Sequence, residues 1–404
     1  MADPVTIAER LAPRLAQRAA GYDLEAAFPQ ADIDDIRQAG LLALLVPERL
    51  GGLGAEFADY ARVAMALAQG SGATALLFNM HASVTGALAG VPDELARQLG
   101  APEEFFDSRD RILRRAAEGA MYGVAITERR VGSRLSVLQT SYAPEGGGYQ
   151  ITGEKSVCSG AGFLDGYLVA ARAEGRADAD AQISYFLVPA GAGAVATGEW
   201  DPLGMRATAS RGLRLDARVP ADALIGFEGL ALLLAYALPQ WLVASYAAVY
   251  VGLAQSALAH AVEHLRGREA VATPGPAAEP QRGALTRLAS VRARVGRADA
   301  QIEAARAALE EAARRVDLDP GKPETNRAVY RAKLLAGDVA MDISASLCEA
   351  CGLGALSRPG PLERIFRDAR CGAVMPPSSD VCADYLGTAA LGLDQFTGTD
   401  VRPW

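Results

Sequence analysis

Residues that commonly form metal and redox sites are scarce in this sequence. Its 404 residues include 3 histidines and 5 cysteines. The cysteines lack the regular spacing of a disulfide framework, although Cys348 and Cys351 form a CxxC pair of the kind found in zinc and redox sites. A zinc site needs a second pair or two histidines beside it, and His81, His260 and His264 do not stand near this pair. We therefore expect no metal site.

Positive charge is also in short supply. The chain has 40 Lys and Arg residues against 48 Asp and Glu residues, which gives a formal net charge of −8. This balance argues against a nucleic-acid-binding protein, because contacts to phosphate need clustered positive charge. The beginning of the chain carries acidic side chains and lacks the apolar core of a signal peptide. Together with the irregular cysteines, it predicts a cytoplasmic protein.

One long stretch lacks charge altogether. Residues 229–262 contain no Asp, Glu, Lys or Arg, and the stretch is longer than the roughly 20 residues that span a bilayer. Pro239, Gln240 and Ser245 interrupt it, and alanine is commoner in it than isoleucine. We expect a helix buried on all faces within a bundle or an oligomer, and no interaction with a membrane.

The first two thirds of the chain divide into a helical part and a strand-rich part. Residues 1–118 have helical composition with short breaks rich in glycine and proline. Residues 119–228 contain several strand-like segments with no helix between them, and in 213–219 apolar side chains alternate with charged ones. Strands in this arrangement predict a small antiparallel barrel or sandwich.

The last part of the chain, residues 229–404, returns to helical composition. Apolar side chains recur every three or four positions over 288–316 and again over 332–347. Such a sustained stripe predicts two long helices of an antiparallel bundle. The stretch 269–281 between the helices is rich in Pro, Gly and Ala, and we expect it to form a loop.

Five short motifs occur in a fixed order along the chain and resemble motifs of the acyl-CoA dehydrogenase family. The corresponding family patterns are T-E-P-x-x-G-S-D, G-x-K-x-x-I-T-N, L-G-M-R-x-T, R-V-P-x-x-x-L-G, and G-G-x-G followed by P-x-E-x-x-x-R-D-x-R. In this sequence they read, in the same order, Ala125–Glu128 with Gly132 and Ser133, Gly153–Ser159, Leu203–Thr208, Val219–Gly226, and Cys351–Gly354 with Pro361–Arg370.

The resemblance extends over essentially the whole chain and implies its architecture. That architecture is an α+β fold with an N-terminal all-α domain (1–118), a central antiparallel β-barrel domain (119–228) and a C-terminal four-helix bundle (229–404). The family assembles as homodimers or homotetramers. It binds a flavin, normally FAD, and oxidises the CH–CH group of an acyl thioester carried by CoA or by a carrier protein. An electron-transfer flavoprotein or O2 accepts the electrons.

The resemblance also assigns residues to the flavin. Backbone along the first motif lies against the isoalloxazine ring, one serine hydroxyl meets the cofactor there, and a second hydroxyl lies beside flavin N5. An arginine from a neighbouring subunit binds phosphate, and two glycines let backbone approach the dinucleotide closely. The corresponding positions here are Val124, Ile126 and Thr127 for the ring, Ser133, Val157 and Ser159 around it, Arg268 for phosphate, and Gly352 and Gly354 for the dinucleotide.

This chain departs from the family where the chemistry takes place. The family's tryptophan beside the flavin is Val157 here. The glutamate that removes the α-proton in the family falls on Pro376, and its alternative position falls on Leu242. Neither side chain can take a proton, so the usual catalytic base is missing. Asp380, four residues after Pro376, is the first candidate for a replacement.

Two other functions remain open at this point. A branch with this fold uses reduced flavin and oxygen to hydroxylate or N-oxidise small molecules, and it needs no base for an α-carbon. Members of that branch often have histidines beside the flavin, and His81 is the candidate here. The other function is that of a catalytically silent partner subunit that keeps the scaffold.

Overall fold

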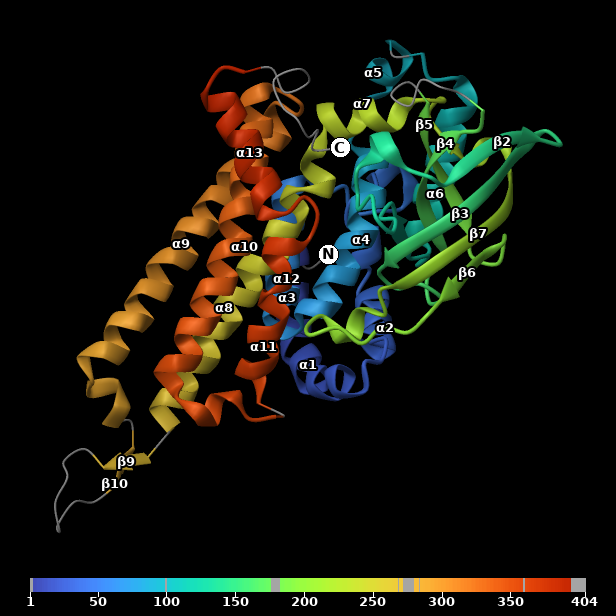
Figure 1. Ribbon diagram of the computed structural model, residues 1–404. Coiled ribbons are helices and arrows are strands. Elements are labelled where there is room, and N and C mark those ends of the chain that lie inside the picture. The colour runs from blue at the N-terminus through green and yellow to red at the C-terminus, as the bar shows by residue number, and fades with distance from the viewer. Residues whose placement is uncertain are drawn as a thin grey trace.

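Three regions lie side by side in the computed structural model, which describes residues 3–98, 100–175, 182–267, 269–271, 280–282, 284–358 and 360–393. Helices α3 (Phe57–Gly70) and α4 (Gly72–Ala89) of the first region lie between the sheet and the long helices of the last region (Figure 1). They contact both, because α3 packs on α8 of the last region and α4 packs on β1 of the sheet.

The N-terminal region is helical, as the composition predicts. Asp3 caps the first helix by accepting a hydrogen bond from the Thr6 amide, and Ser71 caps α4 in the same way through the Thr74 amide. Helix α4 is buried along almost its whole length. The helices are α1 (Pro4–Glu25), α2 (Gln30–Gln38), α3 (Phe57–Gly70), α4 (Gly72–Ala89), α5 (Asp93–Gln98) and α6 (Glu103–Ala117).

The middle region forms one sheet with the strand order β6-β7-β3-β2-β4-β5-β8, and β1 pairs with β4. Most pairings are antiparallel, as expected, but β4 runs parallel to both β1 and β2. The predicted alternation is present in β7, whose apolar side chains are buried and whose charged ones are exposed. The strands are β1 (Tyr122–Ala125), β2 (Ser141–Glu145), β3 (Gly148–Cys158), β4 (Gly166–Ala173), β5 (Ile183–Pro189), β6 (Ala194–Thr197), β7 (Arg211–Pro220) and β8 (Leu224–Ile225).

The last region contains the two long helices that the periodicity predicts, α9 and α10, packed against each other and against α8. The uncharged stretch is a short helix, a single turn at Pro239–Leu242 and then α8, which is largely buried. Among the described residues, no helix combines the length and apolar character needed to cross a membrane. The helices are α7 (Leu230–Ala237), α8 (Ala244–Gly267), α9 (Ala289–Leu318), α10 (Pro323–Cys351), α11 (Pro361–Ala369), α12 (Cys371–Val374) and α13 (Ser379–Ala390).

Two local expectations are resolved by the structure. The stretch expected to be a loop contains two short strands, β9 (Glu269–Val271) and β10 (Pro280–Arg282), which pair with each other, so that expectation was wrong for these residues. The CxxC cysteines are buried in α10, where the Cys348 and Cys351 thiols donate to backbone carbonyls. In the described part of the chain, no group of His, Cys, Asp and Glu side chains is arranged to hold a metal ion.

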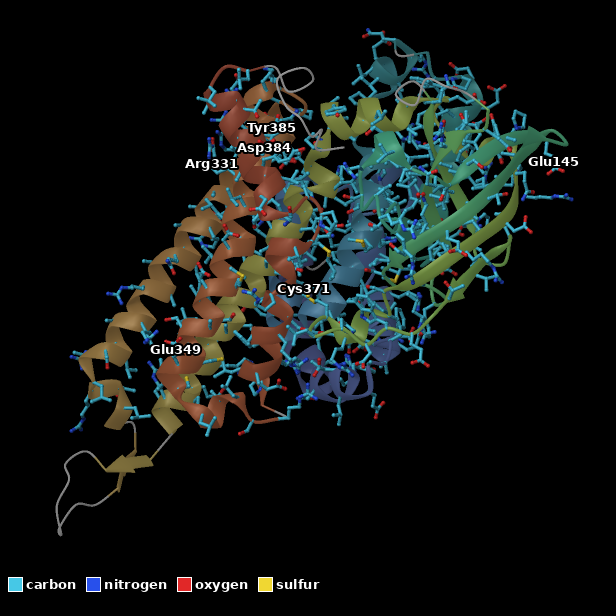
Figure 2. The ribbon with its side chains drawn as sticks, in the orientation of Figure 1. Glu145, Arg331, Glu349, Cys371, Asp384 and Tyr385 are labelled. Atoms are coloured by element: carbon cyan, nitrogen blue, oxygen red, sulfur yellow. The ribbon has the colours of Figure 1, made fainter. Side chains whose placement is uncertain are left out.

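Helix α11 ties the three regions together. The guanidinium of Arg367 lies 2.6 Å from a carboxylate oxygen of Asp23 in α1 and 2.8 Å from one of Glu363 in α11. The neighbouring Asp368 accepts a hydrogen bond from the Met205 amide in the sheet region. At the far end of the bundle, the labelled Tyr385 of α13 stacks on Tyr330 of α10 with ring centroids 3.8 Å apart (Figure 2).

Candidate functional site

A cavity of about 270 Å³ opens where the sheet meets the helical regions. Its walls come from α4, from the chain at and after β1, from the end of β3, and from the segments that precede α8 and α13. Most of the wall is apolar, and four hydroxyl-bearing side chains interrupt it. The lining residues are Met80, Val124, Ile126, Thr127, Ser133, Val157, Ser159, Leu242, Tyr246, Met375 and Pro376.

The cavity brings together all the positions that the resemblance assigns to the flavin ring and its immediate surroundings. They come from segments 124–133 and 157–159, which are separate in the sequence. Among the described residues, the hydroxyls of Thr127 and Ser133 have no hydrogen-bond partner. They are therefore free to bind a ligand in the cavity.

A flat ring system with a polar edge fits these walls. Cofactor pockets are mostly apolar with a few well-placed polar groups, and their volumes usually begin at roughly 300 Å³. The cavity is close to that size, and its hydroxyls lie on Thr127, Ser133, Ser159 and Tyr246. The observed walls thus have the chemistry that an isoalloxazine ring requires.

A buried ion pair fixes the backbone beside Thr127. The Lys155 ammonium lies 2.7 Å from a carboxylate oxygen of Glu128 and also donates to the Ala170 carbonyl at 2.7 Å. Glu128 further accepts hydrogen bonds from the backbone amides of Gln139 and Thr140 and from the Thr140 hydroxyl. The Thr127 carbonyl itself accepts from the Ser156 amide at 2.8 Å.

Burial and pairing shift the protonation of this pair. Burial lowers the pKa of Lys155 to about 8, although the Glu128 charge opposes that shift. Burial alone would raise the pKa of Glu128, but the Lys155 charge and the hydrogen bonds outweigh it and lower this pKa. Glu128 therefore stays ionised and holds the segment that carries Thr127. Sequence reasoning did not assign a role to this pair.

Both positions of the missing base lie in the cavity wall. Pro376 and Leu242 line it, and none of the described residues that line it is an aspartate, glutamate, histidine or lysine. Asp380 lies in the first turn of α13, is exposed, and is not among the lining residues. The structure therefore does not bring the candidate replacement base to the cavity.

His81 is part of the core. Its ring is 1% exposed, Nε2 lies 2.7 Å from the Leu42 carbonyl, and Nδ1 accepts from the Tyr122 amide. Because Leu42 offers only an acceptor, Nε2 carries the proton and the ring is neutral. Burial lowers the pKa of His81 to about 4. Both ring nitrogens are occupied, so His81 cannot act beside a flavin as the oxygenase hypothesis suggested; the neighbouring Met80 lines the cavity instead.

Of the three residues predicted to contact the rest of a dinucleotide, the structure describes Gly352 and Gly354, and both lie away from the cavity. Arg268 is outside the described residues. Gly352 ends α10 with φ 77° and ψ −175°, a conformation that is essentially restricted to glycine. Gly354 follows in a short turn, with no atom within 4 Å of where a Cβ would be. Neither glycine lines the cavity.

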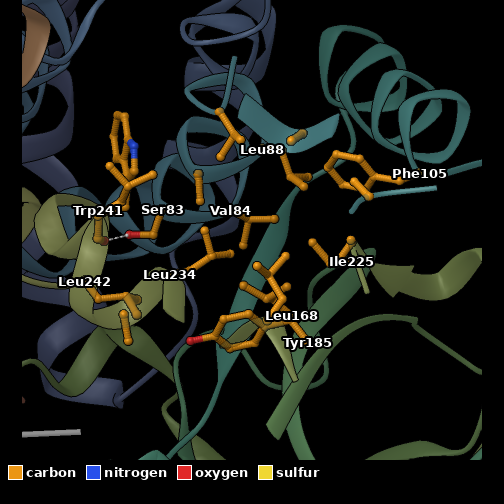
Figure 3. Close-up of a pocket in the computed structure, with 18 of the residues that line it drawn as sticks. Ser83, Val84, Leu88, Phe105, Leu168, Tyr185, Ile225, Leu234, Trp241 and Leu242 are labelled. Carbon is orange, nitrogen blue, oxygen red and sulfur yellow. Dashed lines mark hydrogen bonds between the residues drawn. The ribbon is translucent and has the colours of Figure 1, made fainter. Parts of the chain in front are cut away.

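A second, smaller cavity adjoins the first. It measures about 70 Å³ and lies between α4, α7 and the strands β4 and β5 (Figure 3). Its wall is almost wholly apolar, with Leu168 and Ile225 on one side and Val84 and Leu88 on another. Leu242 lines both cavities. Sequence patterns gave no sign of this space, because its residues come from five separate segments.

The chain matches sequence models of three domains of one family. They are the acyl-CoA dehydrogenase N-terminal domain over residues 6–99, the middle domain over 123–217 and the C-terminal domain over 244–375. Together they account for most of the chain, and their order agrees with the helical, sheet and long-helix regions.

Similar proteins carry out different reactions. The putative acyl-CoA dehydrogenase YdbM of Bacillus subtilis is 28% identical, with 94% of each chain covered. The L-evernosamine nitrososynthase of a Micromonospora species is 30% identical over 95% of this chain and 88% of that protein. Among solved structures, the FMN-bound dibenzothiophene monooxygenase TdsC of Paenibacillus sp. A11-2 superimposes with a TM-score of 0.82 at 26% identity, covering 96% of this chain and 97% of that one.

Proposed function

The chain belongs to the acyl-CoA dehydrogenase family, and we propose that it is a flavin-dependent monooxygenase of that fold rather than a dehydrogenase. The observation that carries the proposal is the wall of the larger cavity. The family's two positions for a base are Pro376 and Leu242, both in that wall, and no other lining residue is ionisable in the range where a base works. Among the described residues that line the cavity, none can therefore remove an α-proton.

The residues of the cavity have simple roles in this proposal. A bound reduced flavin would supply the two electrons and two protons for a reaction in which one atom of O2 enters the substrate and the other leaves as water. Val124, Ile126 and Thr127 would hold the ring, and Ser133 and Ser159 would contribute hydroxyls to it. Apolar side chains such as Leu242 and Met375 keep water away from the reacting atoms. No step of this reaction requires a carboxylate from the chain.

Two of the similar proteins support an oxygen-using reaction. The Micromonospora relative is named a nitrososynthase and TdsC a monooxygenase. Both match this chain over more than nine tenths of its length. We extend their reaction class, but not their substrates, to this protein. The cofactor in this proposal is a flavin, with FAD favoured by the family and FMN by TdsC.

The smaller cavity narrows the class of substrate. Its wall offers almost no polar group, so it suits an aliphatic or aromatic part of a molecule. Its volume of about 70 Å³ is half of the roughly 150 Å³ that binds benzene in an engineered protein cavity. We propose that a short apolar group enters it past Leu242, with the atom to be oxidised left in the larger cavity.

Reconstitution with flavin tests the proposal. The purified protein should bind FAD or FMN, and release of the bound flavin by denaturation identifies which. The flavin, reduced by an added reductase and then exposed to O2, should oxidise small apolar sulfides, amines or indoles with incorporation of one atom from 18O2. Anaerobic bleaching of the flavin by an acyl thioester contradicts the proposal. Failure to bind either flavin favours a silent subunit.

Acyl thioester dehydrogenation is the second candidate. It is favoured by the similarity to the putative acyl-CoA dehydrogenase of Bacillus subtilis over 94% of both chains and by an apolar cavity that suits the end of a short acyl chain. A panel of acyl-CoA and acyl-carrier-protein thioesters, added without oxygen, distinguishes it from the oxygenase. Electron transfer to an electron-transfer flavoprotein would then complete the turnover. A homodimer or homotetramer is proposed for either reaction.

A further inference from the structure

A line of buried hydroxyls runs away from the larger cavity behind Ser159. Ser159 Oγ lies 2.9 Å from Ser210 Oγ, and Ser210 Oγ lies 2.7 Å from Thr208 Oγ1. Thr208 Oγ1 donates to the Met205 carbonyl oxygen at 2.8 Å. The side chains are 8%, 3% and 0% exposed for Ser159, Ser210 and Thr208, so the line is largely shielded from solvent.

The carbonyl at the end of the line is held firmly. It also accepts a hydrogen bond from Trp200 Nε1 at 3.1 Å. Met205 itself has a φ of 54°, a left-handed conformation that is unfavourable for a side chain of this kind. Its amide donates to a carboxylate oxygen of the buried Asp368 at 2.5 Å, which fixes this conformation. The L-G-M-R-x-T motif thus places a fixed acceptor at one end of the line.

The direction of each hydrogen bond in this line of hydroxyls follows from counting the protons that its members can donate. A hydroxyl has one proton to donate, and a carbonyl oxygen has none. Thr208 must use its proton for Met205, so the contact between Ser210 and Thr208 uses the proton of Ser210. The contact between Ser159 and Ser210 then uses the proton of Ser159. Toward the cavity, the Ser159 hydroxyl can therefore present only lone pairs.

We infer that Ser159 is a hydrogen-bond acceptor toward the cavity, and that the site consequently binds reduced flavin more tightly than oxidised flavin. The inference rests on the proposed function, in which the family resemblance sets this hydroxyl beside flavin N5. Reduced N5 carries a proton, and the Ser159 oxygen can accept a hydrogen bond from it. Oxidised N5 carries no proton, so its lone pair would face the lone pairs of the Ser159 oxygen. Ser210, Thr208 and Met205 act through Ser159 and are positioning residues.

This preference suits an enzyme that must hold its flavin reduced until oxygen and substrate arrive. An unpaired polar contact in a buried site costs enough to change an affinity about tenfold. We expect oxidised flavin to bind at least about tenfold more weakly than reduced flavin in the natural protein. Removal of the line behind Ser159 should free its proton for the cavity and abolish most of that difference.

The variant Ser210→Ala tests the inference, with Thr208→Val as a second route to the same effect. The midpoint potential of bound flavin, measured against redox dyes, gives the ratio of dissociation constants for oxidised and reduced flavin without any substrate. Both variants should lower that ratio about tenfold. The matched control is Ser184→Ala, which removes a buried serine hydroxyl bonded to Tyr142 in the same sheet and should leave the ratio unchanged.

Two outcomes overturn the inference and are distinguishable. If the natural protein and Ser210→Ala have the same ratio of dissociation constants for oxidised and reduced flavin, the proton direction at Ser159 does not set the redox preference. The proposed function then still stands. If neither FAD nor FMN binds to the natural protein, the proposed function and the inference fail together. Thermal unfolding followed by circular dichroism verifies that each variant is folded before its potential is interpreted.

Discussion

Replacing Lys155 with methionine is expected to destabilise the protein strongly. Methionine has a similar length and no charge, so the change removes the ammonium and leaves most of the packing. It leaves the Glu128 carboxylate, which is 4% exposed, without its counter-ion. The hydrogen bonds from Thr140 and Gln139 remain but supply no full positive charge. A buried charge that loses its partner typically costs about 3–5 kcal/mol of stability.

The shifted pKa of Lys155 predicts the stability of a variant in which both charges of the pair are removed. A fall from 10.5 to about 8 corresponds to about 3 kcal/mol against the charged form in the folded state. Burying the pair therefore brings little net stability. Lys155→Met combined with Glu128→Gln removes both charges, and we expect it to lie within about 1 kcal/mol of the natural protein.

Urea unfolding at pH 7, followed by circular dichroism, measures these differences. The matched control is Arg218→Met, which breaks an exposed ion pair with Glu145 at the outer end of the sheet (Figure 2) and should cost less than about 1 kcal/mol. The reasoning is refuted if Lys155→Met is as mild as this control, or if the double variant is no more stable than Lys155→Met.

The same pair predicts a dependence on pH. Between pH 8 and 10.5, the folded chain has released the Lys155 proton and the unfolded chain still holds it. Stability should therefore rise with pH across this window, and the rise should be missing in Lys155→Met. If the stability of the natural protein and that of Lys155→Met change in parallel with pH in this window, the lowered pKa of Lys155 is contradicted.

Three further changes give separate tests. Gly86→Ala would put a methyl carbon 2.3 Å from Cζ2 of the Trp241 ring and should lower the urea-unfolding free energy by roughly 1–3 kcal/mol, whereas Gly387→Ala, with nothing within 4 Å, should not. The pKa of His81 is lowered from 6.5 to about 4. The natural protein should therefore lose up to about 3 kcal/mol of stability as the pH falls from 6.5 to about 4. The variant His81→Asn should not show this loss. Asp380→Asn should leave flavin reduction and product formation unchanged, because Asp380 is exposed and outside the cavity wall, and a hundredfold slower anaerobic reduction would restore it as the base.

Much of the fold could be predicted from the sequence because its signals are local. The stripe of apolar residues in α9 and the alternation in β7 are properties of single segments, and both elements formed where expected. Partners of a strand are not local. The parallel pairing of β4 with β1 and β2 depends on how distant segments pack, and the strand patterns suggested only antiparallel neighbours.

In the candidate site too, some features could be predicted from the sequence and others could not. Motif positions such as Thr127, Ser133 and Ser159 meet in one cavity because the fold places the chain after β1 beside the end of β3. The direction in which a side chain points from the first turn of a helix could not be predicted in this way. Asp380 stands only four residues after Pro376, but α13 turns its carboxylate to solvent, which sequence distance could not reveal.

The absence of a base was predictable, and its consequence was not. Reading Pro376 and Leu242 in the sequence shows that neither can accept a proton, but only the cavity wall shows that no other lining group compensates. Proton direction at Ser159 is further removed from the sequence, since it depends on three distances and on the Met205 carbonyl. In the proposed function, the hydroxyl without a free proton favours reduced flavin, and the wall without a base leaves that flavin to react with O2 and not to be reduced by an acyl thioester. The midpoint potential therefore tests the proton direction at Ser159, and the reactions with O2 and with acyl thioesters test the wall.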